Sequence, residues 1–334
     1  MDYGFYLGID VSKLTFDYAL LDSGGTVLGQ GKVDNRPAAI RAWAGEMAAL
    51  LQWRKTLVCM EHSGYYGAHL LNALHTEKAN IWVESALRIK RSIGLQRGKS
   101  DRADALRIAT YCLDFQRKAE LWRPTGANIE RLGLLLSHRD RLVRNLQSVR
   151  NPLEEEKGFV DSAHHEEAAA ITAPVVKALE GAIKGYGTKI KELLDSDGQL
   201  ARQAEIISSI PGFSKVITPK LIEVTRGFTR LTDPRQLACY AGIAPFEHSS
   251  GTSVKGRTRV SHLANKDIKK MLHLAALVTI RKGNIMHAYY QRKVGEGKSP
   301  MTVINAVRNK LVHILLACIR KDVMYEKNYE AGLG

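Results

Sequence analysis

Five stretches in the first third of the chain have the length and composition of β-strands. They are short and apolar, and charged or turn-forming residues bound them. The second and third are joined by Asp22-Ser23-Gly24-Gly25, which is typical of a tight turn between paired strands. The predicted strands are residues 5–11, 16–21, 26–33, 56–60 and 80–83.

Helical periodicity connects the later strands. Apolar residues recur at helical spacing in the segments 37–51, 65–75, 85–93 and 101–115. The order is therefore three strands followed by alternating helices and strands, which predicts an antiparallel start and parallel additions to one mixed five-stranded sheet. This is the order of an RNase H-like α/β domain, and we assign it to residues 1–118.

The middle of the chain, residues 119–200, predicts a helical linker. A Leu- and Arg-rich helix covers 129–149, and Pro152 is expected to end it. In the next helix, apolar residues at alternating steps of three and four mark a coiled-coil seam of about two to three heptads. A hairpin that spaces domains or pairs protomers and a plain intramolecular bundle both fit. The seam residues are Val176, Leu179, Ile183, Tyr186, Ile190 and Leu193.

The last third, residues 201–334, predicts a mainly α-helical domain. Two helices flank the turn Pro211-Gly212-Phe213, and this helix–hairpin–helix exposes backbone N–H groups that suit sequence-independent phosphate contact, with Lys215 beside them. A purely structural hairpin is the alternative. Further helices cover 234–242, 264–282 and 299–321, and a polar loop spans 247–259.

Charge narrows the class of partner. The 334 residues carry a net charge of +15 with a pI near 9.6, and such an excess of cations favours a polyanion, most commonly nucleic acid. A membrane surface is the alternative partner. However, we expect no apolar run of the ~20 residues that span a bilayer, and we expect no signal peptide. We therefore expect a cytoplasmic, nucleoid-associated protein. Its cysteines lack CxxC spacing and predict buried free thiols at Cys59, Cys112, Cys239 and Cys318.

Acidic residues stand where predicted strands end and where a predicted helix begins. Asp10 ends the first strand and Glu61 ends the fourth, while Asp101 and Asp104 share one face of a helix because they are three residues apart. The first and fourth strands are neighbours in the predicted sheet, so the four carboxylates can converge. They would repel each other without a divalent cation, and hard oxygen ligands favour Mg²⁺ or Mn²⁺.

Such a site suits phosphodiester chemistry, in which one ion helps to activate the nucleophile and another stabilises the leaving oxygen. Taken singly, each carboxylate could be a cap or a surface residue, and Asp101 could be the N-cap of its helix. Basic residues nearby fit a phosphate-bearing substrate, with a solvated basic face as the alternative for each. They are Lys13, Arg88, Lys90, Arg91, Arg97, Lys99, Arg102 and Arg107.

The polar loop around residue 250 is the second candidate for chemistry. Its small residues permit close backbone approach to a phosphate, and a serine hydroxyl there could attack phosphorus to form a phosphoseryl intermediate. An ordinary Ser/Gly/Thr loop is the alternative, and His248 is either a base or a solvated side chain. The cations that could neutralise the phosphate are Lys255, Arg257 and Arg259.

Together these motifs resemble the DEDD transposases of bacterial insertion sequences, the bridge-RNA-guided recombinases that include the Piv-type DNA invertases. The resemblance spans nearly the whole chain, and the ordered set is specific although no single motif is. It rests on GIDVSK (8–13), MEHSG (60–64), KSDRADALRIA (99–109), SIPGF (209–213) and CYAGIAPFEHSSGTSVKGRTRVS (239–261).

The resemblance implies a RuvC-like N-terminal domain, a coiled-coil linker and a C-terminal transposase domain. The serine of the family precedes Gly in an S-G-x-S motif and falls on Ser250, with Ser249 and Ser253 as neighbouring candidates. The resemblance further implies a composite active site in a dimer or tetramer, and a non-coding guide RNA that pairs with donor and target DNA. The acidic positions of the family fall on Asp10, Glu61, Asp101 and Asp104.

Three other functions fit part of the sequence. A metal-dependent nuclease of the junction-resolving type would use the same carboxylates with water as the nucleophile. A sugar or acetate kinase has a loop similar to Gly8-Ile9-Asp10, but it also needs a second phosphate loop and an adenosine loop, which we do not find. A non-enzymatic RNA- or DNA-binding protein has no need of converging carboxylates, which oppose a polyanion. The motifs therefore favour a recombinase.

Overall fold

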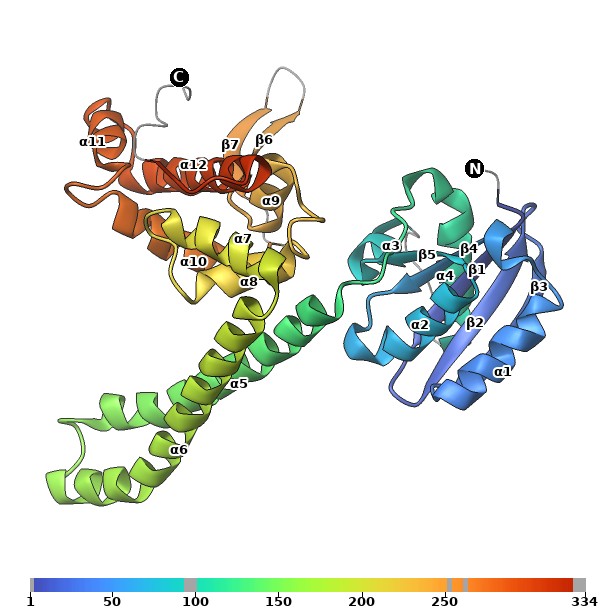
Figure 1. Ribbon diagram of the computed structural model, residues 1–334, viewed down its shortest axis with the longest axis horizontal. Helices are drawn as coiled ribbons and strands as arrows, with labels where there is room; N and C mark the ends of the chain where they lie inside the picture. Colours follow the sequence, from blue (N-terminus) through green and yellow to red (C-terminus); the bar gives the residue numbers. More distant parts are fainter. Residues whose placement is uncertain (1–2, 93–100, 251–253, 261–263, 327–334) are drawn as a thin grey trace. The chain divides into compact units, whose positions relative to one another are not determined.

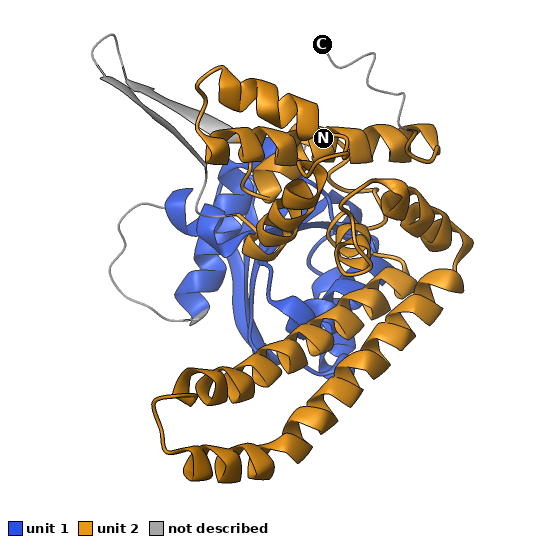
Figure 2. Cartoon of the chain, turned by 90° about the vertical axis from the view of Figure 1, so that its left-hand side faces the viewer, with its two compact units in different colours: residues 1–124 blue, residues 125–334 orange. Residues whose placement is uncertain are grey.

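Two compact units make up the chain, residues 1–124 and residues 125–334 (Figure 2). The computed structural model describes residues 3–92, 101–250, 254–260 and 264–326. The first boundary lies close to the end of the predicted N-terminal domain, and the predicted linker falls within the second unit. The finer division into three domains stays a prediction.

A mixed five-stranded sheet forms the centre of unit 1, as predicted (Figure 1). Its strand order is β3-β2-β1-β4-β5, with β1, β2 and β3 antiparallel and with β4 and β5 added in parallel to β1. Assignment of this sheet to the RuvC-like class stays a prediction. The strands are β1 (Phe5–Val11), β2 (Thr15–Asp22), β3 (Val27–Asp34), β4 (Thr56–Glu61) and β5 (Asn80–Glu84).

Helices cover both faces of this sheet. On one face α1 (Pro37–Ala48) and α2 (Ala68–Thr76) bury Trp43, Leu70 and their apolar neighbours against the strands. On the other face α4 (Asp101–Asp114) packs its small residues on β1, and α3 (Ala86–Ser92) joins the same core through Ile89. Three short 3₁₀ helices complete the described part of unit 1: η1 (Trp53–Lys55), η2 (Gly64–Gly67) and η3 (Gln116–Lys118).

A glycine sets how closely α4 approaches the sheet. A Cβ atom added to Gly8 of β1 would lie 2.1 Å from the backbone nitrogen of Ala109 and 2.4 Å from the backbone oxygen of Ala105. No side chain fits into that space, so glycine is required for backbone-to-backbone packing. The contact holds α4 against β1, two residues before Asp10.

Unit 2 begins with two long antiparallel helices, α5 (Ala127–Glu156) and α6 (Ser162–Asp195) (Figure 1). Arg150 of α5 pairs with Glu180 of α6, and the His138 ring stacks on Tyr186 with centroids 6.1 Å apart. The predicted seam residues are among the less exposed positions of α6, and Ile190 and Leu193 are buried. The helical hairpin is therefore present, while its description as a coiled coil stays a prediction.

The prediction that Pro152 ends the first of these helices is wrong. Helix α5 continues through Pro152 to Glu156, and α6 likewise contains Pro174. A proline has no N–H group and costs a helix interior about 3 kcal/mol, but its fixed φ is close to the helical value. Near the end of a long helix the loss of one hydrogen bond does not stop the helix.

The rest of unit 2 packs around α12 (Pro300–Lys321), whose residues Val303, Val307, Leu311 and Leu315 are fully buried. Helix α11 was not foreseen in the sequence, since its residues show no clear apolar periodicity. The other helices are α7 (Gly198–Ser209), α8 (Ile217–Val224), α9 (Pro234–Tyr240), α10 (Lys266–Thr279) and α11 (His287–Gly295).

The structure changes two further expectations, one about membrane-spanning segments and one about the burial of the cysteines. Among the described helices, α12 alone has the length and hydropathy of a membrane span, although 56% of its most apolar window is buried inside unit 2, as in the core helix of a globular domain. Cys59, Cys112 and Cys318 are buried as predicted, but Cys239 is exposed. It lies on the outer side of the short helix α9, opposite the buried residue Leu237.

The predicted polar loop at 247–259 is instead largely a β-hairpin. Strands β6 (Pro245–Ser250) and β7 (Val254–Val260) pair antiparallel, with Ser250 opposite Val254 and Pro245 opposite Val260. Basic residues alternate with Val, Gly and Thr along β7, and this period of two is the pattern of a strand. The high charge and the glycines concealed the pattern in the sequence.

Candidate active site

A row of charged side chains crosses the whole sheet of unit 1 on the face that α4 covers. Lys32 on β3 is in register with Asp17 on β2, and Asp17 is in register with Asp10 on β1. Glu61 on β4 lies beside Asp10, one residue beyond the pair of Ile9 and Met60. Glu84 on β5 is in register with Glu61. Residues in register share a face of the sheet, so four carboxylates stand side by side on four strands.

The two outer carboxylates of this row have partners. Asp17 is buried and lies 3.3 Å from the Lys32 ammonium. Glu84 is also buried, and it accepts hydrogen bonds from the backbone nitrogen of Ser85 at 2.6 Å, from Arg88 at 3.5 Å and from the Tyr111 hydroxyl at 3.4 Å.

Burial and then the charge of Glu84 raise the pKa of Tyr111 to about 12, which keeps its hydroxyl a donor at neutral pH. Neither Asp17 nor Glu84 was predicted from the sequence as a member of the row. Counting register from the strand ends would have found them, because each stands at the same level as Asp10 or Glu61.

The inner carboxylates form the predicted acidic centre. Glu61 is half-buried, and burial, then the charge of Asp10, then the charge of Asp104 raise its pKa. Asp104 comes from the first turns of α4 and accepts a hydrogen bond from Arg107. The structure thus brings three of the four predicted residues within electrostatic reach of one another.

The fourth predicted residue, Asp101, is the first residue of α4, and its side chain lies outside the described atoms. Among the described residues, no group of three or more His, Cys, Asp or Glu side chains is close enough to hold a metal ion. The donor chemistry nevertheless fits a hard divalent cation, because Asp10, Glu61 and Asp104 offer carboxylate oxygens, and burial and then the charges of Asp10 and Asp104 raise the pKa of Glu61.

The predicted basic residues near this centre occupy different places. Lys13 is exposed between β1 and β2, and Arg91 is exposed near the end of α3. Arg102 is exposed in the first turn of α4 and donates a hydrogen bond to Gln30 on β3 at 2.9 Å. Arg97 and Lys99 lie outside the residues that the structure describes. Lys13, Arg91 and Arg102 therefore remain accessible for a phosphate.

Ser250 is the last residue of β6, immediately before the segment 251–253, which is not described. Lys255, Arg257 and Arg259 occupy alternate positions of β7. For these four residues only the backbone course is described. Ser250 thus ends the first strand of a paired hairpin.

The base of this hairpin is tied to α12. The Asn305 amide donates a hydrogen bond to the backbone oxygen of Ile243 at 2.9 Å, two residues before β6 begins. Arg308, one turn further along α12, is buried and donates to Nδ1 of His273 at 2.6 Å. Its Nε has no hydrogen-bond partner among the residues that the structure describes. Burial, and then the charge of Arg308, lower the pKa of His273.

The predicted phosphate-binding turn joins α7 to α8. Gly212 has a positive φ of 89°, and a Cβ atom there would lie 2.6 Å from the backbone oxygen of Ala275 on α10. Glycine at this position is therefore required by the turn and by its packing. Lys215 is exposed and available for a ligand, and contact of either residue with nucleic acid stays a prediction.

Comparison with known proteins gives two family matches. A model described as a transposase, built for DEDD enzymes of IS110 type, matches residues 7–155. A second, described as "Transposase IS116/IS110/IS902 family", matches residues 204–291. The first match includes all four predicted acidic residues, and the second includes Ser250.

Several relatives share this similarity. A pilin gene-inverting protein of Moraxella lacunata is 25% identical over 326 residues, which cover 96% of this chain and 98% of that protein. The corresponding protein of Moraxella bovis is 24% identical over the same extent. An uncharacterized 43.6 kDa protein of insertion element IS110 from Streptomyces coelicolor is 30% identical over 129 residues, covering 38% of this chain and 31% of that protein.

Proposed function

The chain belongs to the IS110-type DEDD transposases of insertion sequences, a family of DNA-recombining enzymes, and on this premise we propose that it cuts and rejoins DNA through Ser250 and an acidic metal site, guided by a non-coding RNA. The observation that carries the proposal is the electrostatic meeting of Glu61 with Asp10 and Asp104 on one face of the sheet.

The acidic centre would hold the cation through Asp10, Glu61, Asp101 and Asp104. When bound, Mg²⁺ or Mn²⁺ supplies positive charge that stabilises the phosphate oxygens and the developing alkoxide. The protein itself orients these carboxylates by holding α4 against β1. Asp10→Asn and removal of metal with EDTA should each abolish strand exchange, and exchange that survives EDTA contradicts the metal role.

The serine step exchanges one phosphodiester for another. The Ser250 oxygen attacks the scissile phosphorus, the bond to the leaving strand breaks, and the serine proton reaches the leaving oxygen through solvent. The hydroxyl of the incoming strand later attacks the phosphoseryl bond and releases the serine. Bond energy is conserved, so no ATP is required. Lys255, Arg257 and Arg259 neutralise the phosphate as it reacts.

The proposed partners are those that the family resemblance implies, and the charge of the chain is compatible with them. Donor and target DNA are the substrates, and a guide RNA selects both by base pairing while the basic protein binds backbone and shape. Two ends must be cut and joined together, which favours a homo-oligomer, a dimer or a tetramer. Such a protein acts on the nucleoid in the cytoplasm.

A covalent DNA–protein adduct tests the proposal directly. Labelled donor DNA incubated with guide RNA and metal should yield an adduct that survives denaturing electrophoresis. Ser250→Ala should abolish both the adduct and recombination while RNA binding stays near normal. Ser249→Ala is the matched control and should keep both activities. Strand exchange retained in Ser250→Ala excludes the serine mechanism.

A metal-dependent junction nuclease is the second candidate, because all four predicted carboxylates lie within unit 1 and hydrolysis by water needs no serine. The same electrophoresis separates the two functions. Cleavage products without an adduct, unchanged by Ser250→Ala, would favour the nuclease.

A further inference from the structure

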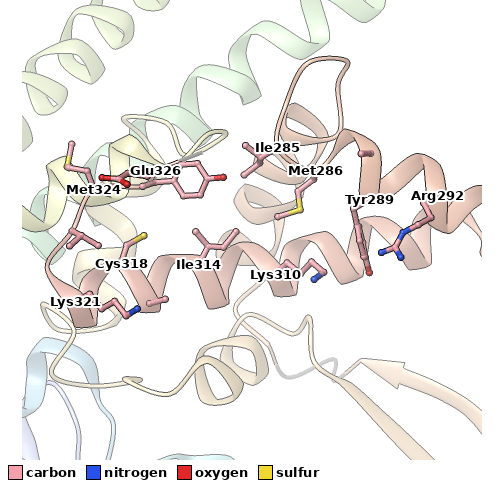
Figure 3. Close-up of a pocket in the computed structure, with 14 residues that line it drawn as sticks. Ile285, Met286, Tyr289, Arg292, Lys310, Ile314, Cys318, Lys321, Met324 and Glu326 are labelled. Carbon is pink, nitrogen blue, oxygen red and sulfur yellow. The ribbon is translucent and has the colours of Figure 1, made fainter. Parts of the chain in front are cut away.

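A groove opens on unit 2 between α11, α12 and the segment 323–326 that follows α12 (Figure 3). Its volume is about 330 Å³, at the lower end of the range of small-molecule sites. Apolar side chains form its centre, among them Met286, Ile314 and Cys318. A volume of this size has room for one flat apolar group.

Two cations flank one aromatic ring at one end of this groove. The Lys310 ammonium lies 4.9 Å from the ring centroid of Tyr289, and the guanidinium carbon of Arg292 lies 5.9 Å from it. Figure 3 shows the ring edge-on between them. Each cation is attracted by the ring, but the two like charges repel. Within the described part of the chain, neither of them forms an ion pair with a carboxylate.

The other end of the groove carries Lys321 and Glu326, which bear opposite charges (Figure 3). The net positive charge is therefore concentrated around Tyr289. A ligand that complements the groove must place an anionic group at the Tyr289 end, beside Arg292 and Lys310, and a flat, mainly apolar group in the centre. A nucleotide has this combination, because its phosphate is joined to a planar base.

We propose that the groove binds one unpaired nucleotide of a single-stranded RNA, with the phosphate at the Tyr289 end beside Arg292 and Lys310 and the base in the apolar centre. Folded RNA presents unpaired bases in loops, where proteins commonly stack them on aromatic rings and guanidinium planes. The bases of duplex DNA stay within the stack and cannot enter. The inference rests on the proposed function for its RNA partner but on neither the serine nor the metal.

Fluorescence anisotropy with a labelled single-stranded RNA of roughly 15 nucleotides, near the upper site size of single-strand binders, tests the groove. The full-length Ser250→Ala variant serves as the parent, so that binding is measured without chemistry. The pair Arg292→Gln and Lys310→Gln should weaken binding about tenfold or more. The slope of log K against log salt should become shallower by about 0.7, for the one phosphate that the two cations neutralise.

A matched control removes two cations elsewhere in unit 2. Lys189 and Lys191 on α6 are exposed and already paired with Glu192 and Asp195, so their double change to Gln should leave affinity and salt slope nearly unchanged. Tyr289→Leu keeps apolar volume but removes the ring, and it should weaken RNA binding while binding of duplex DNA stays constant. The Arg292 and Lys310 substitutions thus test the charged part of the site, and Tyr289→Leu tests the aromatic part.

Four results would overturn the inference. They are unchanged RNA affinity in both groove variants, an equal loss for duplex DNA, a loss confined to single-stranded DNA of the same sequence, and tighter binding of an oligoglutamate peptide than of RNA at the groove. Failure of the catalytic proposal is read separately, from the covalent adduct. The two proposals can therefore fail independently.

Discussion

Two kinds of carboxylate share one face of the sheet in unit 1, and they differ in what neutralises them. Asp17 is buried beside Lys32. Glu84 is buried beside Arg88 and Tyr111. Glu61 instead stands near the like charges of Asp10 and Asp104. The outer carboxylates are held by these partners. In the middle Arg107 pairs with Asp104, yet burial and then the charges of Asp10 and Asp104 still raise the pKa of Glu61, which a bound cation would offset.

The first prediction removes charge from that centre. Because the folded state raises the pKa of Glu61, its ionised form weakens folding above the unfolded pKa. Glu61→Gln should therefore raise the melting temperature of the metal-free protein by a few degrees, where about 1 kcal/mol corresponds to roughly 2–4 °C. It should also remove the further stabilisation that Mg²⁺ gives the unaltered protein.

Differential scanning fluorimetry with and without Mg²⁺ measures both effects. Glu120→Gln, at an exposed loop position of unit 1, is the control and should change neither. A Glu61→Gln protein that melts lower in EDTA and keeps its response to Mg²⁺ would contradict the acidic centre.

The second prediction concerns the buried cation under the serine hairpin. Burial and Arg308 lower the pKa of His273 in the folded protein, so the unfolded chain takes up the proton first. The free energy of unfolding should therefore be highest above about pH 6.5, the ordinary pKa of a histidine side chain, and should decrease as the pH falls below this value. Denaturant midpoints between pH 8 and pH 5 measure this decline.

His273→Gln should flatten that pH dependence, because the amide oxygen can still accept from Arg308 without titrating. The exposed residue His69 provides a control, and His69→Gln should leave the slope unchanged. An identical acid-induced decline in His273→Gln would show that another group causes it.

At the scale of elements, the contact of α4 with β1 sets the geometry of the acidic centre. Asp104 is delivered by α4, and Asp10 by β1, while Gly8 sets their separation. Helix α4 carries small residues toward the strand, with Ala105 and Ala109 fully buried. The helix and the strand must therefore be considered together when substitutions near the site are interpreted.

The third prediction concerns a substitution that would push α4 away from β1. Gly8→Ala forces its Cβ into the α4 backbone, and overpacking of this kind costs about 1–3 kcal/mol or more. Urea denaturation should show the loss, and the Mg²⁺-induced rise in melting temperature should shrink with it. Gly29→Ala is the matched control, because nothing lies within 4 Å of the added Cβ. Equal stability of the two variants would contradict the close contact.

The bounds of some helices and strands could be predicted from the sequence, and those of others could not. The strands of the sheet and α4 were predicted within a few residues, because each is bounded by charge or glycine and has a clear period. Helix α11 and the strands β6 and β7 were missed, since charged and small residues hide their periods and pairing across the chain forms the hairpin. Pro152 was given too much weight against a long helix.

At the scale of the whole molecule, the net charge of +15 dominates the interaction with a polyanion. The fourth prediction is a steep salt dependence of duplex DNA binding. If about six phosphates are neutralised, affinity should fall roughly 10³-fold between about 50 and 200 mM salt. Anisotropy titrations at several salt concentrations measure the slope. Binding that ignores salt, or equal affinity for anionic lipid vesicles, would contradict nucleic acid as the partner.

The sequence by itself determined the mixed five-stranded sheet with its antiparallel start, the carboxylates at the strand ends and the basic character of the chain. Hydrophobic period and charge are local properties, so neighbouring residues express them without a partner. Only the tertiary structure decided that Asp17 and Glu84 join the acidic row, that Gly8 admits α4, and that Tyr289 stands between two cations. These features depend on register and on contacts between distant segments, which no local pattern encodes.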